Sequence, residues 1–361
     1  MSDRLAMLRE KLAEAEIDVL IVSQPENRRY LSGFTGSAGV LIIGPQTAFL
    51  ATDFRYYTQA AEEAPAFQLA KVGYKLTDHL ADLLAAAGAK RVGFESEHLT
   101  VAELARWQEA APDVEWVPTA NLVEGLRAVK SADEIEKIRV AVQVADEAFT
   151  RVLQQLRPGI TEREVAWMLR AEMHALGAEG VAFETIVAAG LNGAKPHYRP
   201  ADREIPAGVP IVIDMGAVVD GYHSDMTRTV VIGEPDDMFR EIYGLVLEAQ
   251  EKAEAHIRAG MNGVEADALA RDVIEAAGHA DHFGHGLGHG VGLAVHEAPR
   301  LSFTAGEAPL EPNMVVTIEP GVYLPDWGGV RIEDIGVVRE DGLEILTQTP
   351  KDLEAQLIPV S

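Results

Sequence analysis

Hydrophobic and polar positions alternate with two different periods along the first third of the chain. Leu5, Leu8 and Leu12 recur at the spacing of an amphipathic helix. Short apolar runs of the kind that form buried strands follow. The predicted strands cover residues 18–23, 39–44, 47–52 and 91–95, and a predicted helix covers residues 77–87. This order predicts a small α/β domain in which helices pack on a sheet.

The pattern changes near residues 120–131, where we place a domain boundary. Ser131 and Glu134 have the spacing of a capping box, which predicts the start of a long helix. The apolar stripe of that helix consists of Ile135, Ile138, Val142 and Ala145. Further on, residues 258–278 repeat the helical pattern of residues 157–177, which indicates an internal duplication.

Two apolar runs that flank Asp220-Gly221 predict a hairpin with a tight turn. If these two residues form the turn, Asp214 lies opposite Thr227, and Asp225 is its diagonal neighbour on the same face. Two buried carboxylates repel each other unless a cation lies between them. The acids either bind a metal or, alternatively, cap a turn or face solvent, and we favour the metal.

A second hairpin, within residues 313–338, carries one acid in each of its apolar runs. Glu319 ends the run VVTI, and Glu333 follows GGVRI. Their separation of 14 residues is even, which allows both side chains on one face of a sheet if no bulge intervenes. Together with the aspartate pair, these residues strengthen the prediction of a metal site.

The segment DHFGHGLGHGVGLAVHE (281–297) combines alternating glycines with histidines. Five glycines disfavour a helix by roughly 1 kcal/mol each relative to alanine. The spacing also fails the G-x-G-x-x-G pattern of nucleotide binding. We expect an extended strand with His285, Leu287, His289 and Val291 on one face.

Composition limits the chemistry further. The net charge of −26 argues against a nucleic-acid partner, because phosphate contact needs a basic patch. The chain has no cysteine, so a metal would be held by His, Asp and Glu. The charged start and the lack of a run of 18 apolar residues predict a cytoplasmic protein with no membrane segment. Four carboxylates with one or two imidazoles suit Mn²⁺ or Co²⁺ as well as Zn²⁺.

These motifs, taken in order, resemble the pita-bread metallopeptidases. IDMGA, HSDMTRT, HGLGHGVGL, TIEPG and RIED carry Asp214, Asp225, His289, Glu319 and Glu333. FTGSAG (34–39) and TDFRYYTQA (52–60) narrow the resemblance to the Xaa-Pro peptidases, aminopeptidase P and prolidase. The resemblance implies an α+β fold, with an N-terminal α/β creatinase-like domain (1–125) and a C-terminal pita-bread catalytic domain (126–361).

The same resemblance implies a reaction and a role for each residue. The substrate would be a peptide with proline at its second position, and the cofactors two divalent ions, Mn²⁺ in the first place. Asp214 and Asp225 would bind one metal, Asp225 and Glu333 would bridge both, and His289 and Glu319 would complete the other site. A bridging water would be the nucleophile, with Glu319 as the proton shuttle.

Other residues would contact the substrate or support the ligands. The resemblance implies that His296 contacts the scissile carbonyl and that His197 is a further substrate-binding histidine. His285 and Arg331 would line the site. Thr227 either orients a ligand carboxylate or simply favours the strand.

Several alternatives stay open. A dipeptidase needs a cation that recognises the substrate carboxylate, and Arg28, Arg29 and Arg55 are candidates, whereas aminopeptidase P leaves that direction open. A metal-free pita-bread binding module or a creatinase-like hydrolase is the alternative in another class. The resemblance also implies a homodimer.

Overall fold

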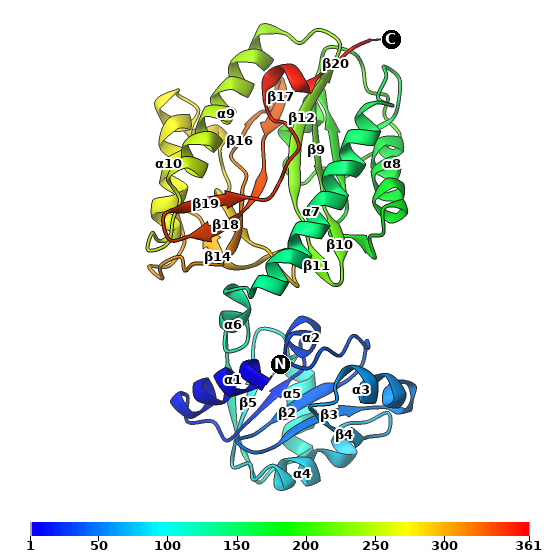
Figure 1. Ribbon diagram of the computed structural model, residues 1–361, viewed down its shortest axis with the longest axis vertical. Helices are drawn as coiled ribbons and strands as arrows, with labels where there is room; N and C mark the ends of the chain where they lie inside the picture. The colour runs from blue at the N-terminus through cyan, green and yellow to red at the C-terminus, as the bar shows by residue number, and fades with distance from the viewer. Residues whose placement is uncertain (1, 361) are drawn as a thin grey trace. The chain divides into compact units, whose positions relative to one another are not determined.

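The computed structural model describes residues 2–360 and divides the chain into two units (Figure 1). The first unit runs to Arg127 and the second begins at Ala128.

The N-terminal unit is built on one mixed sheet of six strands in the order β4-β3-β2-β1-β5-β6. The strands are β1 (Val19–Val22), β2 (Val40–Ile43), β3 (Ala48–Thr52), β4 (Gln68–Lys71), β5 (Arg91–Glu95) and β6 (Glu115–Thr119). The helices are α1 (Ser2–Glu14), α2 (Pro25–Ser32), α3 (Tyr57–Glu63), α4 (Thr77–Ala86), α5 (Val101–Ala110) and α6 (Glu124–Ala128). All four predicted strands and the helix near 77–87 are confirmed, because continuous apolar runs such as β1 are buried along their whole length.

The first half of the C-terminal unit packs two helices against a four-stranded sheet in the order β20-β12-β9-β8. Its elements are α7 (Ala132–Leu153), α8 (Glu162–Ala175), β8 (Ile186–Ala189), β9 (Pro210–Met215), β12 (Met226–Ile232) and the late strand β20 (Leu357–Ile358). A smaller sheet joins β7 (Gly180–Val181), β10 (Ala217–Val219) and β11 (Tyr222–His223). Ser131 and Glu134 form the predicted capping box of α7, and its predicted apolar stripe is buried.

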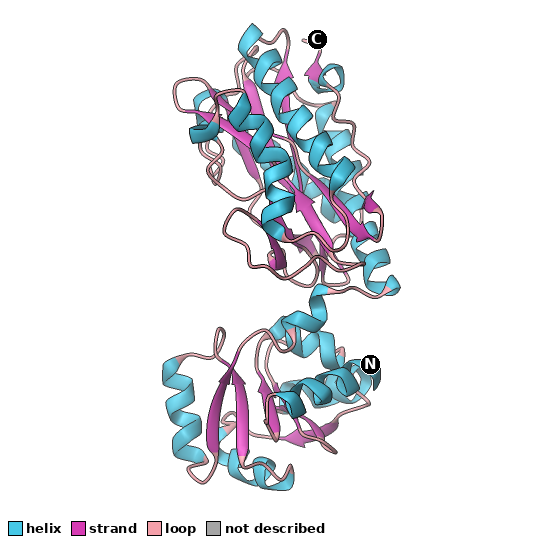
Figure 2. Cartoon of the chain, turned by 90° about the vertical axis from the view of Figure 1, so that its left-hand side faces the viewer, coloured by secondary structure: helices cyan, strands magenta, loops and turns pink. Residues whose placement is uncertain are grey.

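The second half repeats this arrangement with α9 (Asp237–His256) and α10 (Gly263–Ala276). Its five-stranded sheet has the order β14-β13-β15-β18-β19, and a separate hairpin joins β16 and β17. The strands are β13 (Gly288–Gly290), β14 (Glu297–Leu301), β15 (Val315–Ile318), β16 (Gly321–Leu324), β17 (Gly328–Arg331), β18 (Asp334–Arg339) and β19 (Gly342–Ile345). Figure 2 shows the long helices lying over the strands of this unit.

The bounds of α10 lie 101 residues after those of α8 at both ends, which supports the predicted duplication. Both helices begin with a capping box, formed by Thr161 in α8 and by Asn262 in α10. A capping box satisfies two of the backbone N–H groups that every helix start leaves without partners. The same local chemistry therefore starts both helices.

The predicted register of the first hairpin is confirmed. Asp214 pairs with Thr227, and the turn residues Asp220 and Gly221 both have positive φ angles, 46° and 72°. This is the backbone of a type I′ turn, which matches the right-handed twist of the flanking strands.

The second predicted hairpin is wrong in its pairing. The run VVTI forms β15, and β17 consists of the first four residues of GGVRI, but β15 pairs with β18, while β17 pairs with β16. The acids still meet, because the β15–β18 register, continued one residue beyond Ile318–Asp334, sets Glu319 opposite Glu333.

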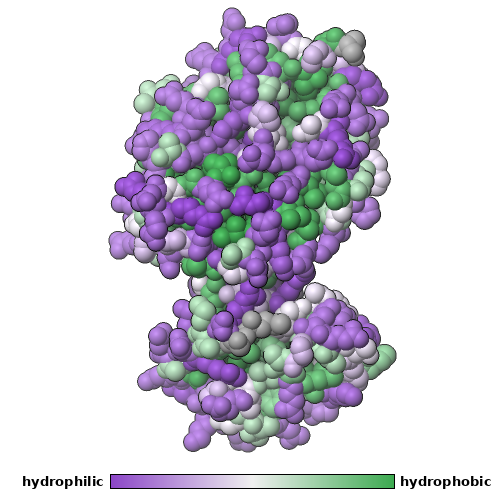
Figure 3. Space-filling model, viewed as in Figure 1, coloured by the Kyte–Doolittle hydropathy of each residue, from purple (hydrophilic) through white to green (hydrophobic). Residues whose placement is uncertain are grey.

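The surface in Figure 3 is mostly hydrophilic, with smaller apolar areas, because most large apolar side chains pack in the interior of the two units. Within residues 2–360, no helix combines the length and the apolar character needed to cross a membrane.

Candidate metal centre

Five polar side chains reach one region of the C-terminal unit from separate strands. Asp214 belongs to β9, and Asp225 comes directly before β12. His289 is the middle residue of β13. Glu319 follows β15, and Glu333 connects β17 with β18. Ligands on strands are held by the sheet hydrogen bonds around them, so the backbone arranges the site before anything binds.

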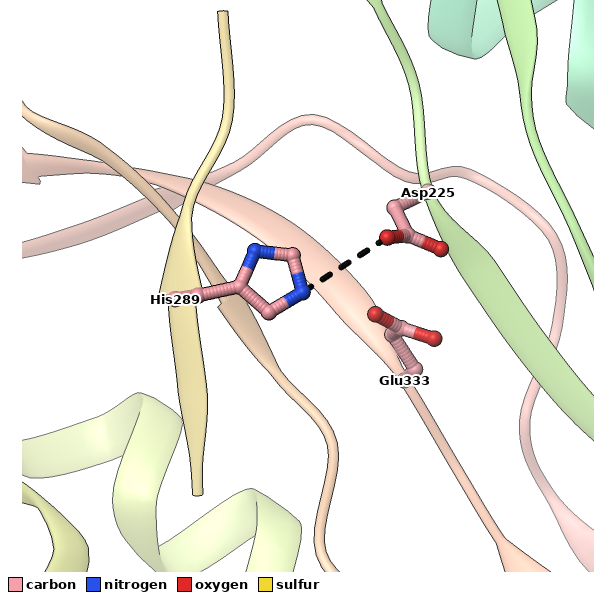
Figure 4. Close-up of side chains that lie close together, drawn as sticks. All are labelled: Asp225, His289 and Glu333. Atoms are coloured by element: carbon pink, nitrogen blue, oxygen red, sulfur yellow. Dashed lines mark ion pairs between the residues drawn. The ribbon is translucent and has the colours of Figure 1, made fainter. Parts of the chain in front are cut away.

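Three of these residues form a compact cluster (Figure 4). Asp225, His289 and Glu333 each offer one ligand atom, and these atoms lie within 4.8 Å of one another. The His289 Nε2 atom lies 3.7 Å from Asp225 Oδ2 and 3.4 Å from Glu319 Oε1. Oxygens of two carboxylates therefore lie close to the same imidazole nitrogen.

The backbone around His289 explains the alternating glycines. A Cβ atom on Gly288 would lie 2.0 Å from the Thr317 carbonyl oxygen, and one on Gly290 would lie 2.1 Å from that of Ala298. Neither position has room for a side chain. The predicted strand is shorter than expected, because regular pairing covers only residues 288–290, with a bulge between His289 and Gly290. A bulge re-aims a side chain.

The imidazole of His289 is held in one tautomer. Its Nδ1 lies 3.1 Å from the Gly290 carbonyl, which can only accept, so Nδ1 carries the proton. Burial lowers the pKa of His289 to about 4. The neutral ring therefore directs the lone pair of Nε2 at the carboxylates, an arrangement of acceptors that a cation would complete.

The charged forms of these carboxylates are destabilised by their surroundings. Burial, followed by the charges of neighbouring acids, raises the pKa of Asp225 and of Glu333 well above their usual values. Burial also raises the pKa of Glu319 to about 7. A cation bound between these carboxylates would attract their negative charges and so offset both burial and mutual repulsion.

Arg331 links the acids on the other side of the cluster. Its Nη2 donates to Asp214 Oδ2 at 2.7 Å, its Nε to Thr227 Oγ1 at 3.0 Å, and its Nη1 to the Tyr323 hydroxyl at 2.8 Å. Thr227 in turn donates to Glu333 Oε2 at 2.7 Å. Asp214 Oδ1 is buried and accepts no hydrogen bond, so it remains available as a ligand atom.

The other predicted histidines surround this centre. The rings of His296 and His289 have centroids 4.1 Å apart. The His285 Nε2 atom lies 2.8 Å from the Tyr323 hydroxyl. Burial is the main cause that lowers the pKa of His285 and of His296, and the charge of His197 is a smaller cause for both.

Sequence reasoning missed two residues that support the ligands. Tyr323 contacts both Arg331 and His285, and Thr317 Oγ1 lies 3.1 Å from Glu319 Oε1. Both residues occupy ordinary apolar strands, so no local signal distinguishes them. Thr227 donates a hydrogen bond to Glu333, one of the carboxylates predicted to be a ligand.

The contacts of two candidate arginines of the N-terminal unit, Arg28 and Arg55, are defined. Arg28 is buried and donates to the carbonyls of Gly36 and Gly39. Arg55 donates to both oxygens of Asp53 through Nε and Nη2. Its side chain is the more exposed of the two. Arg28 is therefore a structural residue rather than a recognition group for a substrate carboxylate.

Comparison with known proteins agrees with this architecture. Residues 136–340 match the model of metallopeptidase family M24, and residues 4–129 match the creatinase/prolidase N-terminal domain. A protein of Pyrococcus furiosus named Xaa-Pro dipeptidase is 38% identical over 98% of this chain and 100% of its own length.

Two solved structures are similar along almost the whole chain. A structure described as an Xaa-Pro dipeptidase from Bacillus anthracis superposes with a TM-score of 0.96 at 42% identity, and covers 99% of each chain. A structure described as an X-Pro aminopeptidase from Thermotoga maritima has a TM-score of 0.88 at 40% identity, and covers 96% of this chain and 98% of its own.

The chain belongs to metallopeptidase family M24, with the creatinase/prolidase domain at its N-terminus. The predicted fold class is confirmed: an α+β protein in which a pita-bread domain follows a smaller α/β domain. A family whose members are metallopeptidases accounts for the convergence of acids on the neutral His289.

Proposed function

We propose that this protein hydrolyses the Xaa-Pro bond at the N-terminus of peptides, with two divalent ions held by Asp214, Asp225, His289, Glu319 and Glu333. The observation that carries the proposal is the buried cluster of acids that converges on the lone pair of His289 Nε2. The names of the relatives, Xaa-Pro dipeptidase and X-Pro aminopeptidase, support proline as the second residue of the substrate.

The donor set fits two cations. Asp214 offers a buried oxygen without a partner, and Asp225 and Glu333 each have two carboxylate oxygens that can be shared. We assign Asp214 and Asp225 to one ion, His289 and Glu319 to the other, and Asp225 and Glu333 to both. Mn²⁺ is the ion we propose first, because oxygen-rich sites suit it, with Co²⁺ and Zn²⁺ as alternatives.

The chemistry divides between the ions and the side chains. When bound, the ions would hold a water molecule and lower its pKa toward neutrality. Glu319 would accept a proton of the attacking water at a carboxylate oxygen and deliver it to the proline nitrogen as the C–N bond breaks.

Histidines hold the substrate on the open side of the centre. The ring of His296 contacts that of His289 at an angle of 44°, and His197 and His296 are both exposed. We assign them to the carbonyl of the scissile bond, where a donated hydrogen bond stabilises the charge that develops on oxygen. Arg331 orients Asp214 and Thr227 orients Glu333, so the ligands keep their positions during the reaction.

The decisive experiment compares an Xaa-Pro dipeptide with an Xaa-Pro-Yaa tripeptide in the presence of Mn²⁺. We expect hydrolysis of at least one, loss of activity after chelation, and recovery when Mn²⁺ is restored. Cleavage of the dipeptide alone assigns a dipeptidase, whereas cleavage of the tripeptide assigns an aminopeptidase. An Xaa-Ala peptide is the matched control for the proline requirement.

The Asp225→Asn variant tests the shared ligand. An amide cannot bridge two cations as a carboxylate does. We therefore expect both the activity and the Mn²⁺ content of the variant to fall. Full activity in this variant contradicts the assignment.

Light scattering with and without Mn²⁺ tests the homodimer that we also propose.

A further inference from the structure

The carboxylate of Glu162, the first residue of α8, is completely buried and accepts four hydrogen bonds. The Ala189 N–H and Asn192 Nδ2 donate to Oε1 at 3.1 and 2.9 Å. The Tyr198 hydroxyl and the Ala201 N–H donate to Oε2 at 2.8 and 3.3 Å. A buried carboxylate is unfavourable unless it is hydrogen-bonded, and here both oxygens are satisfied.

The four donors lie on both sides of His197 in the sequence. Ala189 and Asn192 precede it, whereas Tyr198 and Ala201 follow it. One carboxylate therefore fastens both ends of the segment 189–201, which otherwise consists of a short 3₁₀ helix, a turn and irregular chain. His197 itself is exposed in the middle of this segment.

The start of helix α8 does not need Glu162. Thr161 and Glu164 form its capping box. The equivalent residue of the duplicated helix α10, 101 positions later, is Gly263, and this helix has the same length of 14 residues and its own capping box. A carboxylate at this position is thus dispensable for the helix, and its bonds to segment 189–201 distinguish the first half of the unit from the second.

We propose that Glu162 is a positioning residue, which fixes segment 189–201 so that His197 meets the substrate in one orientation. This rests on the proposed function, in which His197 binds the substrate. A loop that is ordered in advance does not lose conformational entropy when substrate binds, so Glu162 acts mainly on substrate affinity. None of the four donors to its carboxylate belongs to a proposed metal ligand.

The test compares Glu162→Gln with Glu164→Gln. Glutamine removes the charge and turns one acceptor into a donor, which then faces donors of segment 189–201. Glu164 is an exposed residue of the same helical turn, and glutamine also serves in a capping box, so this variant is a matched control. Hydrogen exchange of peptides that cover 189–201 should accelerate in Glu162→Gln and stay unchanged in Glu164→Gln.

Kinetics with an Xaa-Pro peptide and Mn²⁺ then link the segment to His197. We expect Glu162→Gln to lower kcat/KM about tenfold, chiefly through KM, since small displacements of substrate-positioning groups have effects of this order. Mn²⁺ affinity, measured by titration calorimetry, should be unchanged. In a His197→Ala background the same substitution should cost less than about twofold, because coupled residues are not additive.

Three results would overturn the proposal. They are unchanged hydrogen exchange in segment 189–201, additive losses of kcat/KM with His197→Ala, or a loss of Mn²⁺ affinity as large as the loss of kcat/KM. If Glu162→Gln does not fold, Tyr198→Phe removes a single donor and should accelerate exchange in the same segment. A wild-type protein that hydrolyses no Xaa-Pro peptide contradicts the proposed function and with it the role in substrate affinity. The exchange comparison needs no substrate and decides separately whether Glu162 holds the segment.

Discussion

Arg331 binds one oxygen of Asp214 at 2.7 Å and leaves the other oxygen of this carboxylate buried without a hydrogen bond. The guanidinium thus selects which oxygen faces the proposed ions. Because the same group also reaches Thr227 and Tyr323, it fixes several parts of the site with one rigid fork.

Replacement of Arg331 by lysine should therefore weaken metal binding. Lysine keeps the charge but cannot make the three directed contacts at once. We expect Mn²⁺ affinity to fall about 10- to 100-fold, the usual effect of losing a group that orients a ligand, with a parallel fall in activity. Calorimetry measures the affinity. Arg339→Lys, in a partly exposed ion pair with Glu344, is the control and should bind Mn²⁺ normally.

Thr227 should be sensitive to the loss of one oxygen atom. Valine has the same shape, but it removes the hydrogen bond to Glu333 and leaves the Nε of Arg331 without its partner. A buried polar group left unsatisfied costs about 1–3 kcal/mol, so we expect a lower free energy of unfolding in urea as well as weaker Mn²⁺ binding. Thr227→Ser keeps the hydroxyl and should resemble the wild type. Equal losses in both variants would show that shape, and not the hydroxyl, matters at this position.

Asp214 and Thr227 show how far the sequence predicts the site. The hairpin through Asp214 and Thr227 was predictable to the register, because side chains alternate with a period of two and Asp220-Gly221 specifies the turn. Glu319 and Glu333 were predicted to share one face of a sheet, but the strand pairing that brings them together was not predicted. The β16–β17 hairpin is inserted between them in the sequence. No local pattern reports contacts between such distant strands.

The support around the centre was the least predictable part. Glu162 lies in a capping-box sequence, where an acid is ordinary, and only the fold shows that it binds segment 189–201. Tyr323 is similarly ordinary within an apolar strand. Residues that act through hydrogen bonds to distant parts of the chain carry no signature in their own neighbourhood.

Stability should depend on pH through Glu254. Burial, then the charge of Asp334, raises its pKa from 4.5 to about 7, although Lys351 opposes the shift. Between these values the folded protein holds a proton that the unfolded chain has lost, so its stability falls as pH rises and levels off above about 7. The contribution is about 3 kcal/mol.

Urea unfolding at pH 5 and pH 8 measures this dependence. Glu254→Gln cannot lose a proton, so the fall in stability between the two pH values should be smaller than in the wild type by most of that amount. Glu248→Gln, on the same helix, is the control, and it should keep the wild-type dependence. An unchanged difference in Glu254→Gln would exclude Glu254 as its source.

The buried pair of Asp267 and Arg271 should show strong coupling. Arg271 donates to both oxygens of Asp267 and to the carbonyls of Phe283 and His285, so α10 holds the start of the segment that carries His285. Arg271→Gln leaves the nearly inaccessible Asp267 carboxylate without its cation, and we expect a loss of about 3 kcal/mol in the free energy of unfolding. In Asp267→Asn/Arg271→Gln no unpaired charge remains buried, so part of the stability should return. A double variant that loses as much as the two single variants together would mean that the contacts with backbone, and not the ion pair, determine the stability of this segment.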